Sequence, residues 1–167
     1  MAHANMNQDL KVFGGYSILY AERNLDPRSR YYFMNPYHQR ITIQRAELLA
    51  VSKALENIID DLYGKYSSNK KYAINTESSY VIGCLTRWYK QWEINGYINA
   101  KGNPVLNQRL IRSILTKLNV INAVYEKRGW RKLYFNKISI ESRNFASNKS
   151  NTLARNGAIW AITKFDN

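Results

Sequence analysis

The feature that most constrains the fold is an apolar repeat between residues 44 and 63. Leu48, Val51, Leu55 and Leu62, with an isoleucine pair between the last two, recur every three to four residues, which lines one face of an α-helix. Residues 70–76 then alternate between polar and apolar side chains, which is typical of a β-strand. A long helix followed directly by a strand favours a domain in which helices pack on a sheet.

Two earlier segments predict a β-hairpin. Residues 14–21 begin with two glycines and continue as a strand, and residues 31–34 form a second short strand. The turn-forming sequence at residues 24–28 lies between them. Further along, Ser78 is placed to cap a helix that carries Tyr80, Val81, Cys84 and Leu85.

The second half of the chain continues the alternation of helices and strands. Residues 96–104 hold two glycines and a proline and predict a loop, after which helical spacing returns over residues 105–125. Residues 137–141 alternate as a last core strand, and residues 147–165 predict a final helix. This order of elements is that of an α/β protein.

Size and charge limit the classes of function. With 167 residues, of which 45% are hydrophobic, we expect a single domain over residues 1–167. The chain has 25 Lys and Arg against 12 Asp and Glu, a formal net charge of +13, which favours binding to nucleic acid phosphates. It lacks an apolar run of membrane-spanning length and a signal peptide, so we expect an intracellular protein without a membrane partner. Mitochondrial, nuclear and viral settings stay open.

Two motifs carry a resemblance to a known family. Residues 42–48, Thr-Ile-Gln-Arg-Ala-Glu-Leu, and residues 76–81, Thr-Glu-Ser-Ser-Tyr-Val, are similar to segments of the ribonuclease H family of cellular type, which cuts the RNA strand of RNA–DNA hybrids. The first motif places Glu47 at the family's catalytic Glu, and the second places Glu77 where the family has Asp. The resemblance runs in order from Gly14 to about residue 161. It implies a ribonuclease H-like α/β fold, with a five-stranded mixed sheet flanked by helices.

The chain departs from the family at its other acidic positions. Asn151 stands where the last helix of the family carries an Asp. The family's first acid falls nearest to His3 or Ala4, and Asp9 is the only acid in that part of the chain, so the opening strand is truncated or degenerate. Residues 141–144 contain no His where the family has a mobile one.

These departures bear on the chemistry that the resemblance implies. Hydrolysis with two magnesium ions needs a compact carboxylate cluster that holds the ions about 4 Å apart. The extra methylene of Glu77 moves its carboxylate by roughly 1 Å, and an error of that size can cost about a hundredfold in rate. Asn151 keeps a carbonyl oxygen and loses the charge. We therefore predict that Glu47, Glu77 and Asn151 mark an inactive site without a metal or other cofactor; Mg²⁺ would be required only by an active form.

The family's basic protrusion, which holds the DNA strand of the hybrid, is similar to residues 88–110. Trp88 and Trp92 are four residues apart and share a helix face, so we expect at least one of them to lie in the core. The residues predicted to contact structured RNA, an RNA–DNA hybrid or a duplex are Thr42, Gln44, Ser78, Arg87, Trp88, Lys90, Trp92, Lys101, Asn107 and Arg109.

The sequence thus favours a catalytically inactive ribonuclease H-like module that binds nucleic acid, with protein partners in a ribonucleoprotein, replication or viral assembly. One alternative is an active nuclease that uses Glu47, Glu77 and Asp9, or that receives its first strand from a longer native chain. Another is a protein-interaction scaffold in which the charge only aids solubility. Salt-sensitive nucleic acid binding separates the binding module from the scaffold, and metal-dependent cleavage separates the nuclease from both.

Overall fold

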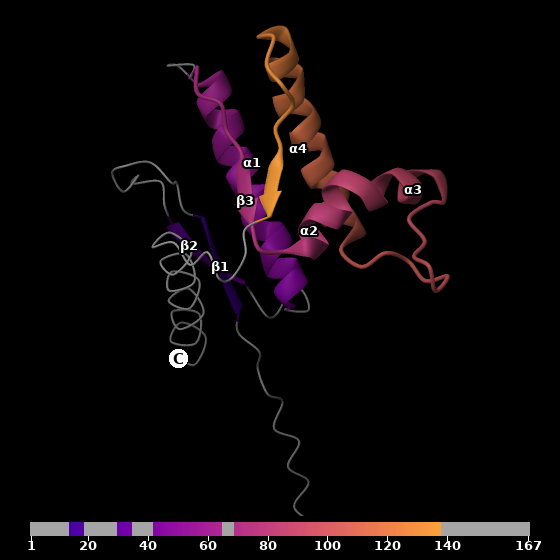
Figure 1. The fold of residues 1–167 in the computed structure, drawn as a ribbon. Helices are drawn as coiled ribbons and strands as arrows, with labels where there is room; N and C mark the ends of the chain where they lie inside the picture. Colours follow the sequence, from indigo (N-terminus) through magenta and orange to yellow (C-terminus); the bar gives the residue numbers. More distant parts are fainter. Residues whose placement is uncertain (1–13, 19–29, 35–41, 65–68, 138–167) are drawn as a thin grey trace, which may run out of the picture.

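A computed structural model of the chain describes residues 14–18, 30–34, 42–64 and 69–137. Of the strand predicted over residues 137–141, the structure describes only Lys137, which ends a strand that begins earlier, at Phe135; residues 138–141 and the predicted helix over residues 147–165 lie outside these ranges. The elements are, in chain order, β1 (Gly14–Ile18), β2 (Arg30–Met34), α1 (Ile43–Tyr63), β3 (Ile74–Thr76), α2 (Ser79–Gly83), the π-helical turn η1 (Cys84–Trp88), α3 (Tyr89–Ile94), α4 (Gln108–Lys127) and β4 (Phe135–Lys137) (Figure 1).

The described strands form one antiparallel and one parallel pair. Strands β1 and β2 pair antiparallel, with Gly14 opposite Met34, which confirms the predicted hairpin. Strands β3 and β4 pair in parallel, with Thr76 opposite Lys137, and the segment from α2 to α4 makes the crossover that a parallel pair requires. The strand predicted from residue 70 begins only at Ile74.

A side-chain contact accounts for this shorter strand. The backbone N–H of Tyr72 donates to the hydroxyl of Tyr125 on α4 at 2.8 Å instead of to a neighbouring strand. The first strand bond on this side is made by Ile74, whose N–H donates to the carbonyl of Tyr134 at 3.0 Å. The alternating pattern therefore marked an extended segment, of which only the end pairs as a strand.

Helix α1 confirms the predicted apolar repeat. The hydroxyl of Thr42 caps its first turn by accepting a hydrogen bond from the N–H of Arg45 at 3.1 Å. The side chains that it buries include those of the repeat: Leu48, Val51, Leu55, Ile58 and Leu62. This face supplies one side of the core.

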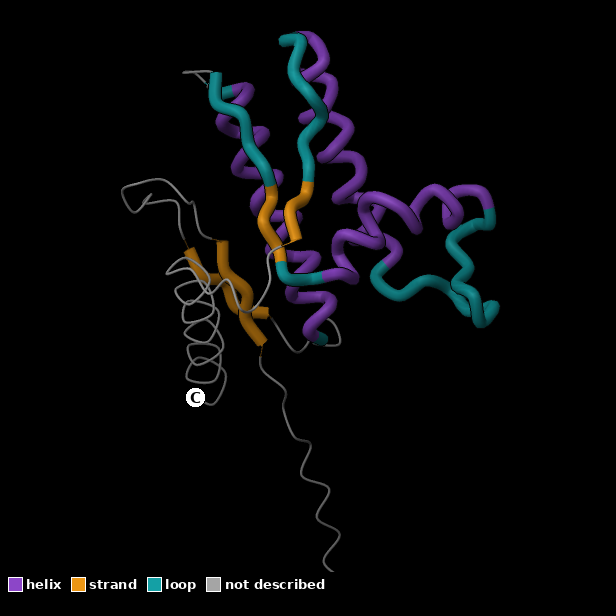
Figure 2. The backbone as a smooth tube through the Cα atoms, viewed as in Figure 1, coloured by secondary structure: helices purple, strands orange, loops and turns teal. Residues whose placement is uncertain are grey.

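Helix α4 packs against it through Ile111, Ile114, Leu118 and Ile121. It begins at Gln108 rather than at residue 105, because Asn107 has a φ of 60° and so cannot continue a right-handed helix toward the N-terminus. Helices α1 and α4 lie side by side and run in the same direction, with their C-terminal ends at the top of Figures 1 and 2.

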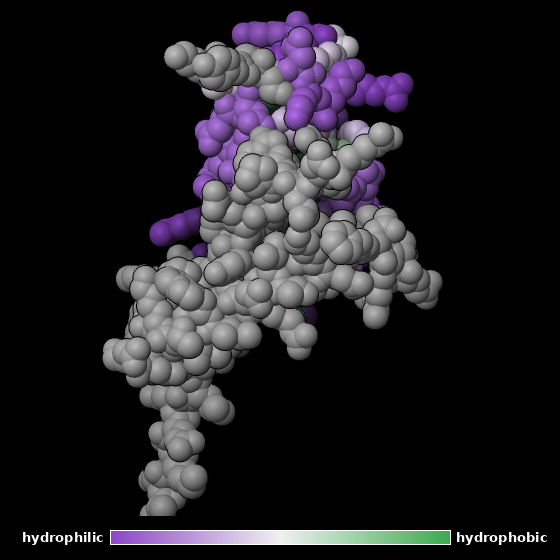
Figure 3. All heavy atoms as spheres, turned by 90° about the vertical axis from the view of Figure 1, so that its left-hand side faces the viewer, coloured by the Kyte–Doolittle hydropathy of each residue, from purple (hydrophilic) through white to green (hydrophobic). Residues whose placement is uncertain are grey.

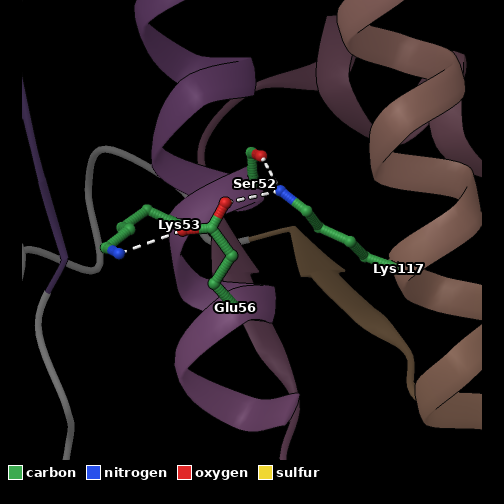
Figure 4. Close-up of polar contacts among 4 residues, drawn as sticks. All are labelled: Ser52, Lys53, Glu56 and Lys117. Carbon is green, nitrogen blue, oxygen red and sulfur yellow. Dashed lines mark hydrogen bonds and ion pairs between the residues drawn. The ribbon is translucent and has the colours of Figure 1, made fainter. Parts of the chain in front are cut away.

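A polar bridge joins the two helices halfway along (Figure 4). The ammonium of Lys117 on α4 lies 2.6 Å from one carboxylate oxygen of Glu56 and donates to the hydroxyl of Ser52 at 2.7 Å. Lys53 donates to the other oxygen of Glu56 at 3.0 Å. Burial alone would raise the pKa of Glu56, but the hydrogen bonds from Lys117 and Lys53 outweigh it and lower that pKa. The bridge thus connects α1 and α4 beside their apolar contact.

No helix within the described ranges is long and apolar enough to cross a membrane.

Candidate active site and nucleic-acid interface

An open pocket of about 540 Å³ lies where the start of α1 meets the turn between β3 and α2. Its lining comprises Thr42, Ile43, Gln44, Glu47, Glu77, Ser78, Ser79 and Tyr80. Two predicted motifs, far apart in the sequence, therefore meet at one place. All the predicted site residues of these motifs, namely Thr42, Gln44, Glu47, Glu77 and Ser78, line the same pocket.

Ser78 is the residue that links the two sides of this pocket. Its hydroxyl donates to Oε2 of Glu47 at 2.6 Å and accepts from the N–H of Val81 at 3.2 Å, so it caps α2 and orients the Glu47 carboxylate at once. Its own N–H donates to the hydroxyl of Thr76 at 3.1 Å. Ser78 is only 7% exposed, which makes these bonds costly to lose. The predicted capping role of Ser78 is confirmed.

The described residues bring two carboxylates, Glu47 and Glu77, to the pocket. Within the described ranges, no three His, Cys, Asp or Glu side chains are grouped so that they could hold a metal ion. Two hard magnesium ions need more carboxylate ligands than this pair supplies, so the described donor set does not fit a two-ion centre. Asn151, Asp9 and the predicted positions of the family's first acid and mobile His lie outside the described residues.

Lys137 is a pocket neighbour that the sequence did not predict. Its ammonium donates to the hydroxyl of Ser79, which lines the pocket, and so adds a positive charge at the rim. The contact depends on the register of the parallel pair, in which Lys137 lies opposite Thr76. No local sequence pattern specifies that register, because the two strands are separated by the whole α2–α4 crossover.

Tyr80 lines the pocket and is hydrogen-bonded to the side chain of Asn107, which precedes α4. Burial, followed by the nearby Cys84, raises the pKa of Tyr80 to about 12, although the Asn107 side chain acts in the opposite direction. The side chain of Asn107 also accepts a hydrogen bond from Arg45 of α1 at 2.9 Å. Asn107, predicted as a nucleic acid contact, therefore ties the starts of α1 and α4 together.

A row of aromatic side chains leads from the pocket into the predicted protrusion. The ring centroids of Tyr80 and Trp88 are 6.2 Å apart, those of Trp88 and Trp92 are 5.9 Å apart, and those of Trp92 and Tyr97 are 6.2 Å apart. Arg112 of α4 lies 4.1 Å above the Tyr97 ring. Trp92 packs against the core, in line with the expectation for one member of the pair, whereas Trp88 is 40% exposed.

The protrusion itself is an ordered loop with exposed cations. The side chain of Asn99 accepts hydrogen bonds from the backbone N–H groups of Lys101 at 2.9 Å and Asn103 at 3.1 Å. The loop is closed by the N–H of Val105, which donates to the carbonyl of Tyr97 at 2.8 Å. The predicted phosphate contacts Arg87, Lys90, Lys101 and Arg109 are all exposed. They lie on η1, α3, the loop and the start of α4, which follow one another along the chain after the pocket residues.

Comparison with solved structures defines the class of fold. The structure of the foamy viral protease–reverse transcriptase in complex with dsDNA matches with a TM-score of 0.57 at 18% identity, covering 87% of this chain and 90% of that chain. The solution structure of the PFV RNase H domain matches with a TM-score of 0.56 at 17% identity, covering 87% and 80% of the two chains. The chain has a ribonuclease H-like fold that mixes helices and strands.

Sequence comparison then gives the family. Residues 5–127 match the family model of RNase H, and the chain belongs to the ribonuclease H family. The ribonuclease H of Anaeromyxobacter sp. (strain K) is 31% identical over 85 residues, which are 51% of this chain and 42% of that protein. The ribonuclease H of Schizosaccharomyces pombe is 29% identical over 117 residues, or 70% of this chain and 37% of that protein. The matches thus span less than half the length of these relatives.

Proposed function

We propose that the chain is a ribonuclease H-like domain that binds nucleic acid through its phosphates and does not cleave it. The observation that carries this proposal is the pair of carboxylates in the pocket, where Glu77 stands in place of an Asp beside Glu47. A carboxylate that is one methylene too long points its oxygens about 1 Å away from the position that an ion would require. With Asn151 at a third acidic position and no acid matched at the first, the site has lost the charge that two ions need.

The same proposal covers the parts of the chain beyond the described residues. It takes residues 1–167 as one domain and extends the β1–β2 and β3–β4 pairs to a five-stranded mixed sheet. It assigns no metal and no other cofactor to the site. The domain would act inside the cell as a basic, architectural part of a ribonucleoprotein, replication or viral assembly, with protein partners and without a membrane.

The ligand follows from charge and exposure. A net charge of +13 favours phosphate contacts of any sequence, and the protrusion offers exposed cations next to an aromatic row. The foamy viral proteins of similar fold were solved in complex with dsDNA and with an RNA/DNA hybrid. We therefore propose a duplex, an RNA–DNA hybrid or structured RNA as the ligand. The proposed contacts are Thr42, Gln44, Ser78, Arg87, Trp88, Lys90, Trp92, Lys101, Asn107 and Arg109.

Binding to an RNA–DNA hybrid over a range of salt concentrations tests this proposal. Wild-type affinity should fall steeply with salt, and replacing Lys90, Lys101 and Arg109 together by Gln should flatten that dependence by roughly 0.9 in log–log slope for each phosphate that is no longer neutralised. The matched control exchanges each of the three cations for the other basic residue, Lys for Arg and Arg for Lys, and should keep the slope. An unchanged slope in the Gln variant would rule out the protrusion as the binding surface, and salt-independent or absent binding would favour the scaffold.

A second candidate function is an active magnesium-dependent ribonuclease H, and the observation in its favour is Glu47, which lies in the pocket at the family's catalytic position. In that case Glu77 and Asp9, or a first strand from a longer native chain, would complete the ligand set. Our proposal expects that Glu77→Asp combined with Asn151→Asp gives no robust cleavage of the hybrid while the first acid is absent. Cleavage at near-family rates by this double variant would show that a first acid is present and that the opening strand has been misplaced, whereas cleavage by the wild-type chain would favour the nuclease.

A further inference from the structure

Two loops lie side by side between the C-terminal ends of α1 and α4, which point away from the pocket, and the strands β3 and β4. We call residues 69–73 and 128–134 the distal loops. Figure 2 shows them descending from the C-terminal ends of α1 and α4 toward β3 and β4. They are fixed in place, because the N–H of Tyr72 bonds the Tyr125 hydroxyl at 2.8 Å and the N–H of Leu133 bonds the Asn122 side chain at 2.9 Å. Helix α4 has 20 residues, so its C-terminal end, where residues 128–134 begin, lies about 30 Å from its start, where the protrusion ends.

Basic side chains gather on the distal loops and the helix end that joins them. The residues concerned are Lys70, Lys71, Lys127, Arg128, Arg131 and Lys132, all exposed except the half-buried Arg128. Figure 3 shows hydrophilic residues covering this end of the molecule. The acids nearby in the described chain are fewer, namely Asp60, Asp61 and Glu126. Asp61 accepts a hydrogen bond from the Tyr72 hydroxyl at 2.5 Å, so part of its charge is already engaged.

Trp130 holds two of these cations close together. The ammonium of Lys71 lies 5.1 Å from the centroid of the indole ring, and the guanidinium of Arg128 lies 5.0 Å from it. The ring is held in turn by an edge contact with Tyr125 at 5.3 Å. The two charges are therefore at most about 10 Å apart, within the Debye length at 0.1 M salt, and repel each other. Cation–π contacts offset that repulsion, and an anion bound between the cations would remove it.

The ordinary explanation of cations at this place is the negative end of a helix dipole. It accounts for Lys127 and Arg128, which end α4. It does not account for Lys71, Arg131 and Lys132, because these side chains belong to the loops and not to the last turn of a helix. The loop cations need another reason.

We propose that the distal loops form a second surface that binds the sugar–phosphate backbone of a nucleic acid. The exposed ring of Tyr134, 57% accessible, adds a face on which an unpaired base can stack. This inference rests on the proposed function in taking nucleic acid as the ligand, but it does not depend on the protrusion. At about 3.4 Å per base pair, a spacing of up to about 30 Å between the two surfaces corresponds to at most roughly nine base pairs of duplex. A duplex of about 24 base pairs is therefore long enough to reach both surfaces.

The test compares variants of the full chain for binding to an RNA–DNA hybrid of about 24 base pairs over a salt series. Arg131→Gln with Lys132→Gln should lower the log–log salt slope by about 1 to 2, since each phosphate that loses its cation removes roughly 0.9. The control, Thr116→Glu with Asn119→Glu, changes the net charge equally at exposed positions midway along α4, and should alter the slope far less. Equal effects of the two variants would overturn the proposal.

The protrusion variant with Lys90, Lys101 and Arg109 replaced by Gln separates this inference from the proposed function. If the proposed function holds and this inference fails, only the protrusion variant shows a weaker dependence of hybrid binding on salt. If the distal variant alone loses slope, the second surface stands and the protrusion is wrong as the main site. A final experiment measures the binding of the wild type and the distal variant to vesicles that contain phosphatidylserine. Loss of vesicle binding in the distal variant, with hybrid binding intact, would assign the distal loops to a lipid surface and overturn the proposal.

Discussion

The α1–α4 interface and the carboxylate pocket share helix α1 but depend on different properties of their side chains. Along the interface, fully buried residues such as Leu48, Leu55, Ile111 and Ile114 meet in an apolar core, and an ion pair between Glu56 and Lys117 bridges the helices. The pocket is open and holds two carboxylates, and its arrangement depends on the position of individual oxygen atoms such as the Ser78 hydroxyl. The interface is stable as long as apolar side chains fill it, whereas the pocket requires a particular charge and side-chain length at each position.

This difference explains how a ribonuclease H-like fold can persist in a chain that has lost its chemistry, as we propose for this one. Exchanging an Asp for a Glu at position 77, or an Asp for an Asn at position 151, removes no apolar side chain from the core. The same exchanges are severe for a two-ion centre, because a misplacement of about 1 Å affects catalysis strongly. Fold and donor set are therefore separable, and mutations in the two regions should differ in size and kind, from the largest effect in the core to the smallest at the surface.

The interface should be the most sensitive region for stability. Ile114 is fully buried, so Ile114→Ala should lower the free energy of unfolding by about 2–5 kcal/mol through reduced burial and a cavity. The matched control is Ile94→Ala, whose side chain is 80% exposed and should matter by less than about 0.5 kcal/mol. Urea denaturation measures both. Similar losses for the two variants would mean that the core lies elsewhere.

The start of the protrusion should be the next most sensitive. A Cβ on Gly83 would lie 2.6 Å from the indole of Trp88, so Gly83→Ala should destabilise the protein by about 1–3 kcal/mol and displace that ring. In a Trp88→Leu background the same change should cost less, because the obstructing ring is gone. A double-mutant cycle by thermal unfolding measures the coupling. Additive effects would contradict the close packing of Gly83 on Trp88.

The pocket should respond to loss of its linking hydroxyl. Ser78→Ala removes the cap of α2 and the bond to Glu47, and should lower the free energy of unfolding by about 0.5–2 kcal/mol, measured by urea denaturation. Ser78→Thr keeps a hydroxyl and should retain most of the stability. If the two substitutions destabilise equally, the hydroxyl is not the group that matters.

The ion pair should give the smallest effect and a defined pH dependence. Because the folded-state pKa of Glu56 is lowered, its contribution is present above the ordinary value of 4.5 and is lost as the pH falls through the lowered value. For a pair this exposed we expect less than about 1 kcal/mol. Glu56→Gln should remove that part of the acid sensitivity, whereas Glu126→Gln at an exposed position should not. Unfolding followed between about pH 3 and pH 6 would show an unaltered profile in Glu56→Gln if the bridge does not form in solution.

The elements that follow from local pattern were predictable from the sequence. The repeat of α1, the β1–β2 hairpin and the Ser78 cap each depend on residues close in the chain, and each is confirmed. The meeting of Glu47 and Glu77 in one pocket followed from the resemblance of their two motifs. It did not follow from periodicity.

The features that the sequence did not predict depend on interactions between distant segments. The late start of α4 depends on Asn107, whose backbone is in the left-handed conformation and whose side chain accepts a hydrogen bond from Arg45 in α1. The short β3 depends on Tyr72 bonding Tyr125 of α4, and the place of Lys137 at the pocket depends on strand register. None of these partners is specified by its neighbours in the chain.

Incubation of the purified protein with an RNA–DNA hybrid and magnesium or manganese ions decides whether the site is inactive. We predict that the hybrid is bound and is recovered uncut, because Glu47 and Glu77 alone cannot site two ions. Metal-dependent cleavage of the RNA strand that disappears in Glu47→Ala would contradict this prediction and would establish an active nuclease.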